Sequence, residues 1–186
     1  MTVDDFFARL VSALDHAGVP YMVTGSYASS AHGIPRATND IDIVIAPTMD
    51  QLATLLREFP SDRYYAEEIA ARDALERRSQ FNVIDFETSW KADLIIRKDR
   101  EFSRVEFSRR RRHSIGGLPV DVATPEDVLL AKLESAKLGE SERQIEDCAG
   151  IIRRQGKDLD RAYVKRWIPD LGLEQQWQRA LAVARR

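Results

Sequence analysis

Apolar residues recur at two different periods along this chain, and each period predicts one kind of element. A spacing of three to four residues puts Phe6, Leu10 and Leu14 on one side of a helix that ends at Gly18. Alternating positions, or short apolar runs bounded by turn residues, predict β-strands instead. Strands are expected at residues 21–24, 40–45, 81–86 and 90–96, and a hairpin is expected at residues 114–122.

The helical period returns between these strands and then takes over the second part of the chain. Thr124 followed by Pro125 and Asp127 is a strong helix start, and Ser141 with Gln144 forms a second one. The sequence therefore predicts an α+β fold, in which a mixed sheet with helical cover over residues 1–123 is followed by a helical bundle over residues 124–186. Helices are expected at residues 27–32, 48–59, 66–78 and 99–109, and two more are expected to begin near residues 160 and 174.

Two aspartates occupy alternate positions of one expected strand. Because successive strand side chains point to opposite faces, Asp40 and Asp42 share a face while Ile41 points toward the core. Neighbouring carboxylates repel each other unless a cation lies between them, and Mg²⁺ prefers such oxygen ligands. Asp93, which has apolar neighbours in another strand, could join them as a third ligand. The alternative is that Asp40 is a turn residue and that the other two are solvated on an exposed sheet face.

Gly25 and Ser26 directly follow the first short strand and begin a helix of small residues. Free N–H groups at a helix N-terminus attract anions, and glycine allows a phosphate to approach closely. The pair stands fifteen positions before Asp40, so a triphosphate held there would direct its α-phosphate toward metals at Asp40 and Asp42. In two-metal phosphoryl transfer, Asp93 would complete the ligand set and help to take the proton from the attacking hydroxyl.

Composition sets wider limits. A chain of 186 residues with 44% hydrophobic content can bury a core, and its formal charge of −2 gives no overall preference for nucleic acid. The single cysteine, Cys148, excludes an internal disulfide and is interpreted as a core residue. No apolar run approaches membrane-spanning length and the N-terminus has no signal-peptide pattern, so we expect no membrane partner and a cytoplasmic location.

Positive charge gathers locally between residues 97 and 113. Eight basic residues stand there against three acidic ones, which gives a formal charge of about +5. Such a cluster could neutralise the phosphates of an RNA backbone, although a charged stretch is also typical of a solvated helix face. The basic residues are Arg97, Lys98, Arg100, Arg104, Arg109, Arg110, Arg111 and Arg112.

The order Gly25-Ser26, Asp40-Ile41-Asp42 and then Asp93 resembles the motif of the DNA polymerase β-type nucleotidyltransferase superfamily. The stretch from Ser29 to Asp40 is also similar to the AbiEii-like minimal nucleotidyltransferases, a group that includes toxins of type IV toxin–antitoxin systems. The resemblance implies a nucleotidyltransferase-like fold and an enzyme that uses Mg²⁺ or Mn²⁺ to move a nucleoside monophosphate from an NTP, such as ATP or CTP, to an acceptor hydroxyl. It favours tRNA or another RNA as the acceptor and a cognate antitoxin protein as a partner.

The helical region beginning at Thr124 resembles the same group, in which a lysine and a later aspartate are needed for activity. This likeness implies that Lys132 neutralises nucleotide phosphate charge and that Asp147 orients Lys132 or contacts the nucleotide. Arg36 and Thr38 would shape the loop over the nucleotide. Lys132 could instead be a surface lysine, and Asp147 could form an ion pair with Arg143 four residues earlier.

Other functions use some of the same residue types. Glycosyltransferases also use Asp-x-Asp, but they would need neither the Gly25-Ser26 turn nor Asp93, and the chain has no Rossmann fingerprint. An EF-hand is excluded because the region of Asp40 lacks its further oxygen ligands. Transfer to a small molecule such as an aminoglycoside, or to a protein hydroxyl, stays open because the same carboxylates serve every acceptor. A non-catalytic nucleotide-binding or antitoxin-type module is also open, although intact carboxylates argue against it.

Overall fold

The computed structural model of this chain describes residues 3–32 and 40–185. Within this part, the chain forms two compact units. Unit 1 contains residues 3–24 and 40–122, and unit 2 contains residues 25–32 and 123–185. An early segment of the chain therefore belongs with the C-terminal helices, which hydrophobic periodicity does not indicate.

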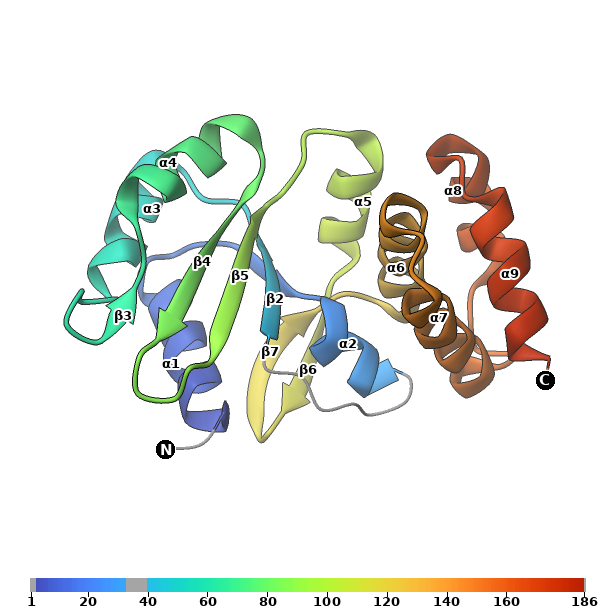
Figure 1. Cartoon of the computed structure of the whole chain (residues 1–186), viewed down its shortest axis with the longest axis horizontal. Helices are drawn as coiled ribbons and strands as arrows, with labels where there is room; N and C mark the ends of the chain where they lie inside the picture. Colours follow the sequence, from blue (N-terminus) through green and yellow to red (C-terminus); the bar gives the residue numbers. More distant parts are fainter. Residues whose placement is uncertain (1–2, 33–39, 186) are drawn as a thin grey trace. The chain divides into compact units, whose positions relative to one another are not determined.

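Unit 1 is built on one mixed sheet with the strand order β3-β4-β5-β2-β1-β7-β6 (Figure 1). The pairs β2–β5 and β1–β7 are parallel, and the other neighbours are antiparallel. The expected strands and hairpin are confirmed, while the short β3 was not predicted and β6 begins earlier than expected. The strands are β1 (Tyr21–Val23), β2 (Asp40–Ile45), β3 (Tyr64–Tyr65), β4 (Gln80–Asp85), β5 (Lys91–Ile96), β6 (Arg111–Ile115) and β7 (Leu118–Val122).

Four helices in the described part of unit 1 accompany the sheet: α1 (Val3–His16), α3 (Met49–Arg57), α4 (Glu68–Arg77) and α5 (Glu101–Arg109). Thr48 caps α3 as expected, and its hydroxyl and the side chain of Gln51 form a reciprocal capping box. The N-cap of α4 is Glu67, whose carboxylate accepts hydrogen bonds from Ile69 N and Ala70 N. This helix therefore begins two residues later than its alanine-rich composition suggested.

The two faces of the central strands differ in chemistry, and α1 shows which face is covered. Ile41, Ile43 and Leu94 are fully buried on one face. On that same face the buried Asp85 of β4 binds Arg9 of α1 across 2.6 Å. Since side chains alternate along a strand, the residues between these buried positions point to the opposite face. The aspartates of β2 and β5 lie on that opposite face.

Unit 2 is helical in its described part (Figure 1). Its α6 begins at the predicted start signal, where Thr124 Oγ1 accepts a hydrogen bond from Asp127 N. Asp127 is almost fully buried and accepts a further hydrogen bond, 2.6 Å long, from the hydroxyl of Tyr163. The helices are α2 (Gly25–His32), α6 (Pro125–Gly139), α7 (Glu142–Gln155), α8 (Arg161–Leu171) and α9 (Glu174–Ala184), with α2 in contact with α6 and α7.

One helix start differs from its prediction. Ser141 is the N-cap residue of α7, but its side chain makes no capping hydrogen bond. Gln144 does not complete a capping box either, because its side-chain oxygen accepts a hydrogen bond of 3.2 Å from Lys132 Nζ. Gln144 therefore connects two helices, which the Ser-x-x-Gln pattern could not reveal.

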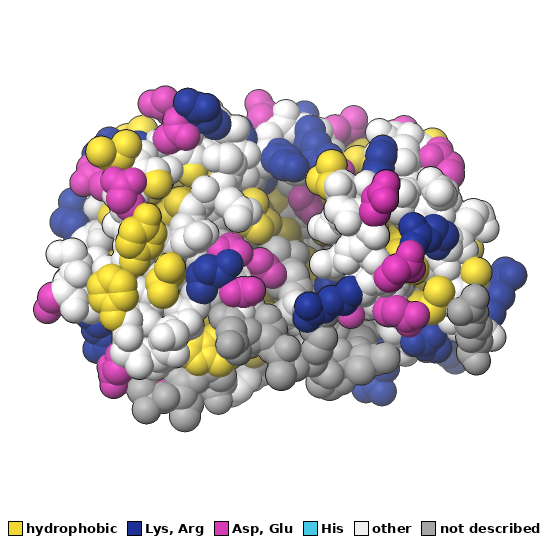
Figure 2. All heavy atoms as spheres, in the orientation of Figure 1, with side chains coloured by type: hydrophobic (Ala, Val, Ile, Leu, Met, Phe, Trp, Pro, Cys, Tyr) yellow, Lys and Arg dark blue, Asp and Glu magenta, His cyan; other side chains and the backbone are white. Residues whose placement is uncertain are grey.

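Exposed apolar side chains gather at one end of unit 1. Figure 2 shows hydrophobic atoms over the part of the surface that carries β3 and α4, where Tyr65 and Ile69 are 47% and 76% exposed. The edge strand β3 contains only two residues, which limits its ability to pair with strands of other chains. Throughout the described part of the chain, the helices are too short or too polar to cross a bilayer.

Candidate active site

The register between β2 and β5 sets the geometry of the predicted aspartates. In this parallel pair Asp42 lies opposite Asp93, and Asp40 lies opposite Lys91. Residues at matched positions of neighbouring strands point to the same face. Because Ile41 and Ala92 are fully buried on the other face, the three predicted aspartates share the sheet face opposite that core.

Lys91 contacts two of these carboxylates. Its Nζ lies 3.1 Å from Asp93 Oδ2 and 3.5 Å from Asp40 Oδ1. Partial burial acts to lower the pKa of Lys91, but the hydrogen bond and charge of Asp93 and the charge of Asp40 outweigh it, so that the pKa is raised. The carboxylates thus stabilise a positive charge at this position.

The residues of this face fit a divalent cation in their chemistry. Asp93 Oδ1 is buried and has no hydrogen-bond partner among the described residues, and such an oxygen is stabilised by a metal ion or a protonated ligand. In residues 3–32 and 40–185, however, no three His, Cys, Asp or Glu side chains are already grouped to hold one ion. A metal site here would therefore require Lys91 to move away from Asp40 and Asp93.

Two polar residues of this face were missed by the sequence reasoning. Lys91 stands two positions before Asp93 in the same strand, so strand periodicity could have placed it beside the aspartates. Asn82 lies opposite Asp93 in the antiparallel pair of β4 and β5 and extends the polar row. Its position depends on the pairing of strands, which the local sequence pattern does not give.

The Gly25-Ser26 turn joins β1 to α2. Thr24 N donates a 2.9 Å hydrogen bond to Asp42 O, and Gly25 follows it directly with φ of +61°. That left-handed conformation is unfavourable for residues with a Cβ atom, which explains the glycine. Helix α2 begins at Gly25, two residues earlier than expected, and has no acidic residue in its first turn. The first turn is therefore compatible with an anionic ligand. Arg36 and Thr38 lie outside the described residues.

Lys132 and Asp147 contact each other inside unit 2. Lys132 Nζ lies 2.8 Å from Asp147 Oδ2, and the lysine is 5% exposed. The alternative of a surface lysine is therefore wrong. Asp147 pairs with Lys132 across α6 and α7, and no ion pair of Arg143 occurs among the residues that the structure describes. The two residues singled out by the family resemblance thus form one ion pair, in which Lys132 is buried and also donates a hydrogen bond to Gln144.

Much of the positive charge at residues 97–113 is engaged within unit 1. Arg104 binds Asp99 at 2.6 Å, and Arg110 and Arg112 both bind Asp121, at 3.3 and 3.5 Å. Arg97 and Arg110 also lie over the ring of Phe107, at 5.5 and 4.3 Å from its centroid. Lys98 and Arg111 are exposed and make no such contacts with described residues. The free charge is therefore smaller than the formal count of the segment.

Comparison with known proteins identifies the fold. No protein-family model and no curated protein sequence matches the chain. The solution structure of the antibiotic-resistance factor ANT(2'')-Ia is similar, with a TM-score of 0.59 and 13% identity over 89% of this chain and 91% of that one. The crystal structure of ANT(2'')-Ia in complex with adenylyl-2''-tobramycin has a TM-score of 0.58 and 14% identity, over 90% of this chain and 95% of that one. The crystal structure of the lincosamide antibiotic adenylyltransferase LnuA with bound lincomycin has a TM-score of 0.53 and 12% identity, over 81% of this chain and 96% of that one. The chain has the nucleotidyltransferase fold.

This likeness confirms the predicted fold class, a mixed sheet with helical cover followed by C-terminal helices. The similarity spans nearly the whole of each chain, so it includes both the sheet and the helices that follow. The identities are too low to carry substrate or residue roles from these proteins. The narrower resemblance to the AbiEii-like group stays a prediction.

Proposed function

We propose that this chain is a metal-dependent nucleotidyltransferase that moves a nucleoside monophosphate from an NTP to an acceptor hydroxyl. The observation that carries the proposal is the register of Asp42 with Asp93, which puts these carboxylates and that of Asp40 on one face of a sheet. The nucleotidyltransferase fold, shown by the similarity to solved structures, supports the same function. Buried Asp93 Oδ1, which has no partner in the described residues, adds an atom suited to a cation.

Asp40, Asp42 and Asp93 would hold Mg²⁺ or Mn²⁺ after Lys91 has moved aside. The bound ions would stabilise negative charge on the transferring phosphoryl group. The acceptor oxygen forms a bond to the α-phosphorus, the bond from that phosphorus to the bridging oxygen of the leaving group breaks, and pyrophosphate departs. Asp93 would take the proton from the acceptor hydroxyl, since its carboxylate lies on the same sheet face as Asp40 and Asp42.

The remaining predicted residues would bind the nucleotide. Gly25 and Ser26 would contact the triphosphate through the N-terminus of α2. Lys132 would supply positive charge to the phosphates, and Asp147, which contacts it directly, would fix its position. In this proposal Arg36 and Thr38, outside the described residues, shape the loop over the nucleotide.

The first candidate acceptor is tRNA or another RNA, as the resemblance to toxin-like nucleotidyltransferases implies. The exposed Lys98 and Arg111, together with the remainder of the basic segment, would contact its phosphates. A cytoplasmic toxin of this kind would have a cognate antitoxin protein as its partner. Ion pairs within the segment reduce the charge available for this contact.

The second candidate acceptor is the hydroxyl group of a small molecule. It is favoured by the two most informative structural neighbours, which are an antibiotic-resistance factor in complex with adenylylated tobramycin and a lincosamide adenylyltransferase. The compact pairing of Arg110 and Arg112 with Asp121 suits this acceptor better than RNA, since it leaves less charge for a polyanion.

The decisive experiment supplies purified protein with Mg²⁺ and each α-labelled NTP, together with total RNA, total protein or a panel of aminoglycosides and lincosamides. Asp42→Ala serves as the inactive variant, and Asp62→Ala, which changes an exposed aspartate outside the site, is the matched control. Label on RNA selects the toxin-like function, and label on a small molecule or on protein selects those acceptors. Transfer that survives Asp42→Ala, or no transfer in any mixture, would reject the proposed enzyme.

A further inference from the structure

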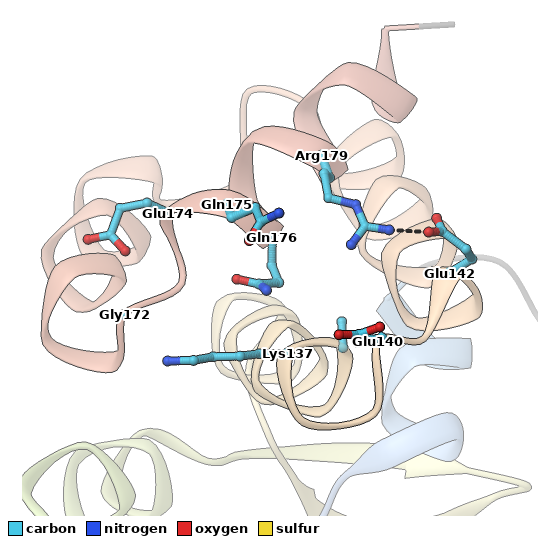
Figure 3. A pocket seen from close by; sticks show the side chains of 9 residues that line it. Lys137, Glu140, Glu142, Gly172, Glu174, Gln175, Gln176 and Arg179 are labelled. Atoms are coloured by element: carbon cyan, nitrogen blue, oxygen red, sulfur yellow. Dashed lines mark hydrogen bonds and ion pairs between the residues drawn. The ribbon is translucent and has the colours of Figure 1, made fainter.

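Unit 2 contains a polar pocket that the proposed transfer reaction does not use. The pocket has a volume of about 670 Å³, which lies in the range of small-molecule sites. It is lined by the last turn of α6, the first turn of α7, the end of α8 and the first turns of α9 (Figure 3). Its chemically important residues are Lys137, Glu140, Glu142, Glu174, Gln176 and Arg179.

Gln176 is the most informative of these residues. It is only 9% exposed, and its side chain points into the pocket between α6 and α9 (Figure 3). Its amide makes no hydrogen bond to another described residue, so it is available to a molecule that enters the pocket. An amide in this position is suited to a ligand that donates and accepts hydrogen bonds.

The charges around Gln176 indicate which ligand it would take. Both cations of the pocket are already engaged: Arg179 forms an ion pair with Glu142, and Lys137 Nζ donates to Leu171 O at 3.2 Å. Glu140 and Glu174 have no ion pair with any described residue. The groups left over are two carboxylates and one amide, and the three carboxylates against two cations give a net charge of −1.

The helix termini do not reverse this preference. The C-terminal ends of α6 and α8 favour a cation, and the N-terminal ends of α7 and α9 favour an anion. Glu142 and Glu174 lie in the first turns of α7 and α9, where their negative charges already compensate the positive ends of the helix dipoles. The formal charges of the side chains therefore decide the selectivity of the pocket.

We propose that this pocket binds a small polyamine, an organic cation with two or three ammonium groups separated by short alkyl chains. Glu140 and Glu174 would bind separate ammonium groups, and the amide of Gln176 would accept a hydrogen bond from an N–H group between them. This binding does not depend on nucleotide transfer.

The test is isothermal titration calorimetry of the whole chain with spermidine, at low salt and without nucleotide or metal. The first variant combines Glu140→Gln with Glu174→Gln, both at exposed positions. Its matched control combines Asp62→Asn with Glu76→Gln, which removes two charges from exposed positions of unit 1. Gln176→Leu is the third protein, and its thermal melt is recorded because the residue is buried.

We expect one spermidine per chain, and an affinity that falls as salt is raised. The Glu140→Gln, Glu174→Gln variant should bind about tenfold more weakly, and Gln176→Leu several-fold more weakly, with the control within about twofold of the wild type. If Gln176→Leu does not fold, the proposal is tested by comparing the Glu140→Gln, Glu174→Gln variant with its control. Absence of saturable spermidine binding, equal binding by the first variant, or tighter binding of inorganic phosphate would overturn the proposal.

Discussion

The two units each contain a lysine between polar acceptors, and the two lysines differ in how firmly they are held. In unit 1, Lys91 is 32% exposed at its side chain and contacts Asp40 and Asp93 at 3.5 and 3.1 Å. In unit 2, the side chain of Lys132 is 6% exposed and contacts Asp147 at 2.8 Å, with Gln144 as a second partner. Lys132 is fixed by burial and short contacts, while Lys91 lies at a surface where a competing cation could replace it.

Because the two lysines differ in burial, their contacts should contribute differently to folding stability. A buried lysine without its carboxylate partner would be strongly destabilising, so the pair in unit 2 contributes to folding as well as to any role with phosphates. The contacts of Lys91 contribute less, because water still reaches its ammonium group and the carboxylate of Asp40. The carboxylates around Lys91 could therefore exchange this lysine for a metal ion. Four substitutions or measurements separate these two situations.

The largest effect is expected at Asp93. Asp93→Asn should lower the rate of nucleotide transfer by about a thousandfold or more, because the change removes both a metal ligand and the base. Folding stability should stay close to that of the wild type, since Asn keeps the shape of the side chain. The rate with labelled NTP and a urea unfolding curve check both parts. Asp73→Asn, at an exposed helix position, is the control; equal losses in the two variants would contradict the assignment.

The next largest effect is expected at Lys132. Lys132→Met should lower the free energy of unfolding by about 3 kcal/mol, because it removes the 2.8 Å ion pair between a buried ammonium group and Asp147. Lys157→Met, an exposed substitution in the same unit, should change it by less than about 0.5 kcal/mol. Chemical denaturation of both proteins makes the comparison. A fall of similar size in both would show that the contact between Lys132 and Asp147 contributes no more to stability than an exposed lysine does.

A smaller and different effect is expected at Lys91. Lys91→Met should change the free energy of unfolding by less than about 1 kcal/mol. It should also tighten Mg²⁺ binding by several-fold, because an ammonium group no longer competes for Asp40 and Asp93. Titration calorimetry with Mg²⁺ measures the affinity. Weaker Mg²⁺ binding in the variant would mean that Lys91 supports the metal site instead of competing with it.

The smallest effect concerns Cys148, next to Asp147 in α7. Burial raises the pKa of this thiol to about 12, with Asp147 adding to the increase and Lys132 opposing it. The thiol should therefore resist a thiol-specific reagent at pH 8 in the native chain and react quickly after unfolding. Because the folded pKa lies above the ordinary thiol pKa of 9.0, this group reduces stability as pH rises from about 9 toward 12. Rapid labelling of native protein at pH 8 would show that unit 2 opens readily.

The elements themselves followed closely from the local sequence. The strand of Asp40, the Thr124 helix start and the Gly116-Gly117 hairpin tip were all predictable, because each depends on side-chain alternation, capping or turn chemistry within a few residues. Ser141 and Gln144 show the limit of this reasoning. Their spacing suggested a capping box, but the side-chain oxygen of Gln144 accepts a hydrogen bond from Lys132, twelve residues away.

The alternation of Asp40, Ile41 and Asp42 determined by itself that two carboxylates would share a sheet face opposite the core, since strand geometry has a period of two residues. Only the tertiary structure decided that Asp93 stands opposite Asp42, that Lys91 lies between the carboxylates, and that Lys132 is buried against Asp147. Register between strands and contacts between helices depend on packing over the whole core. The signals for such contacts are spread along the chain and cannot be read from any one segment.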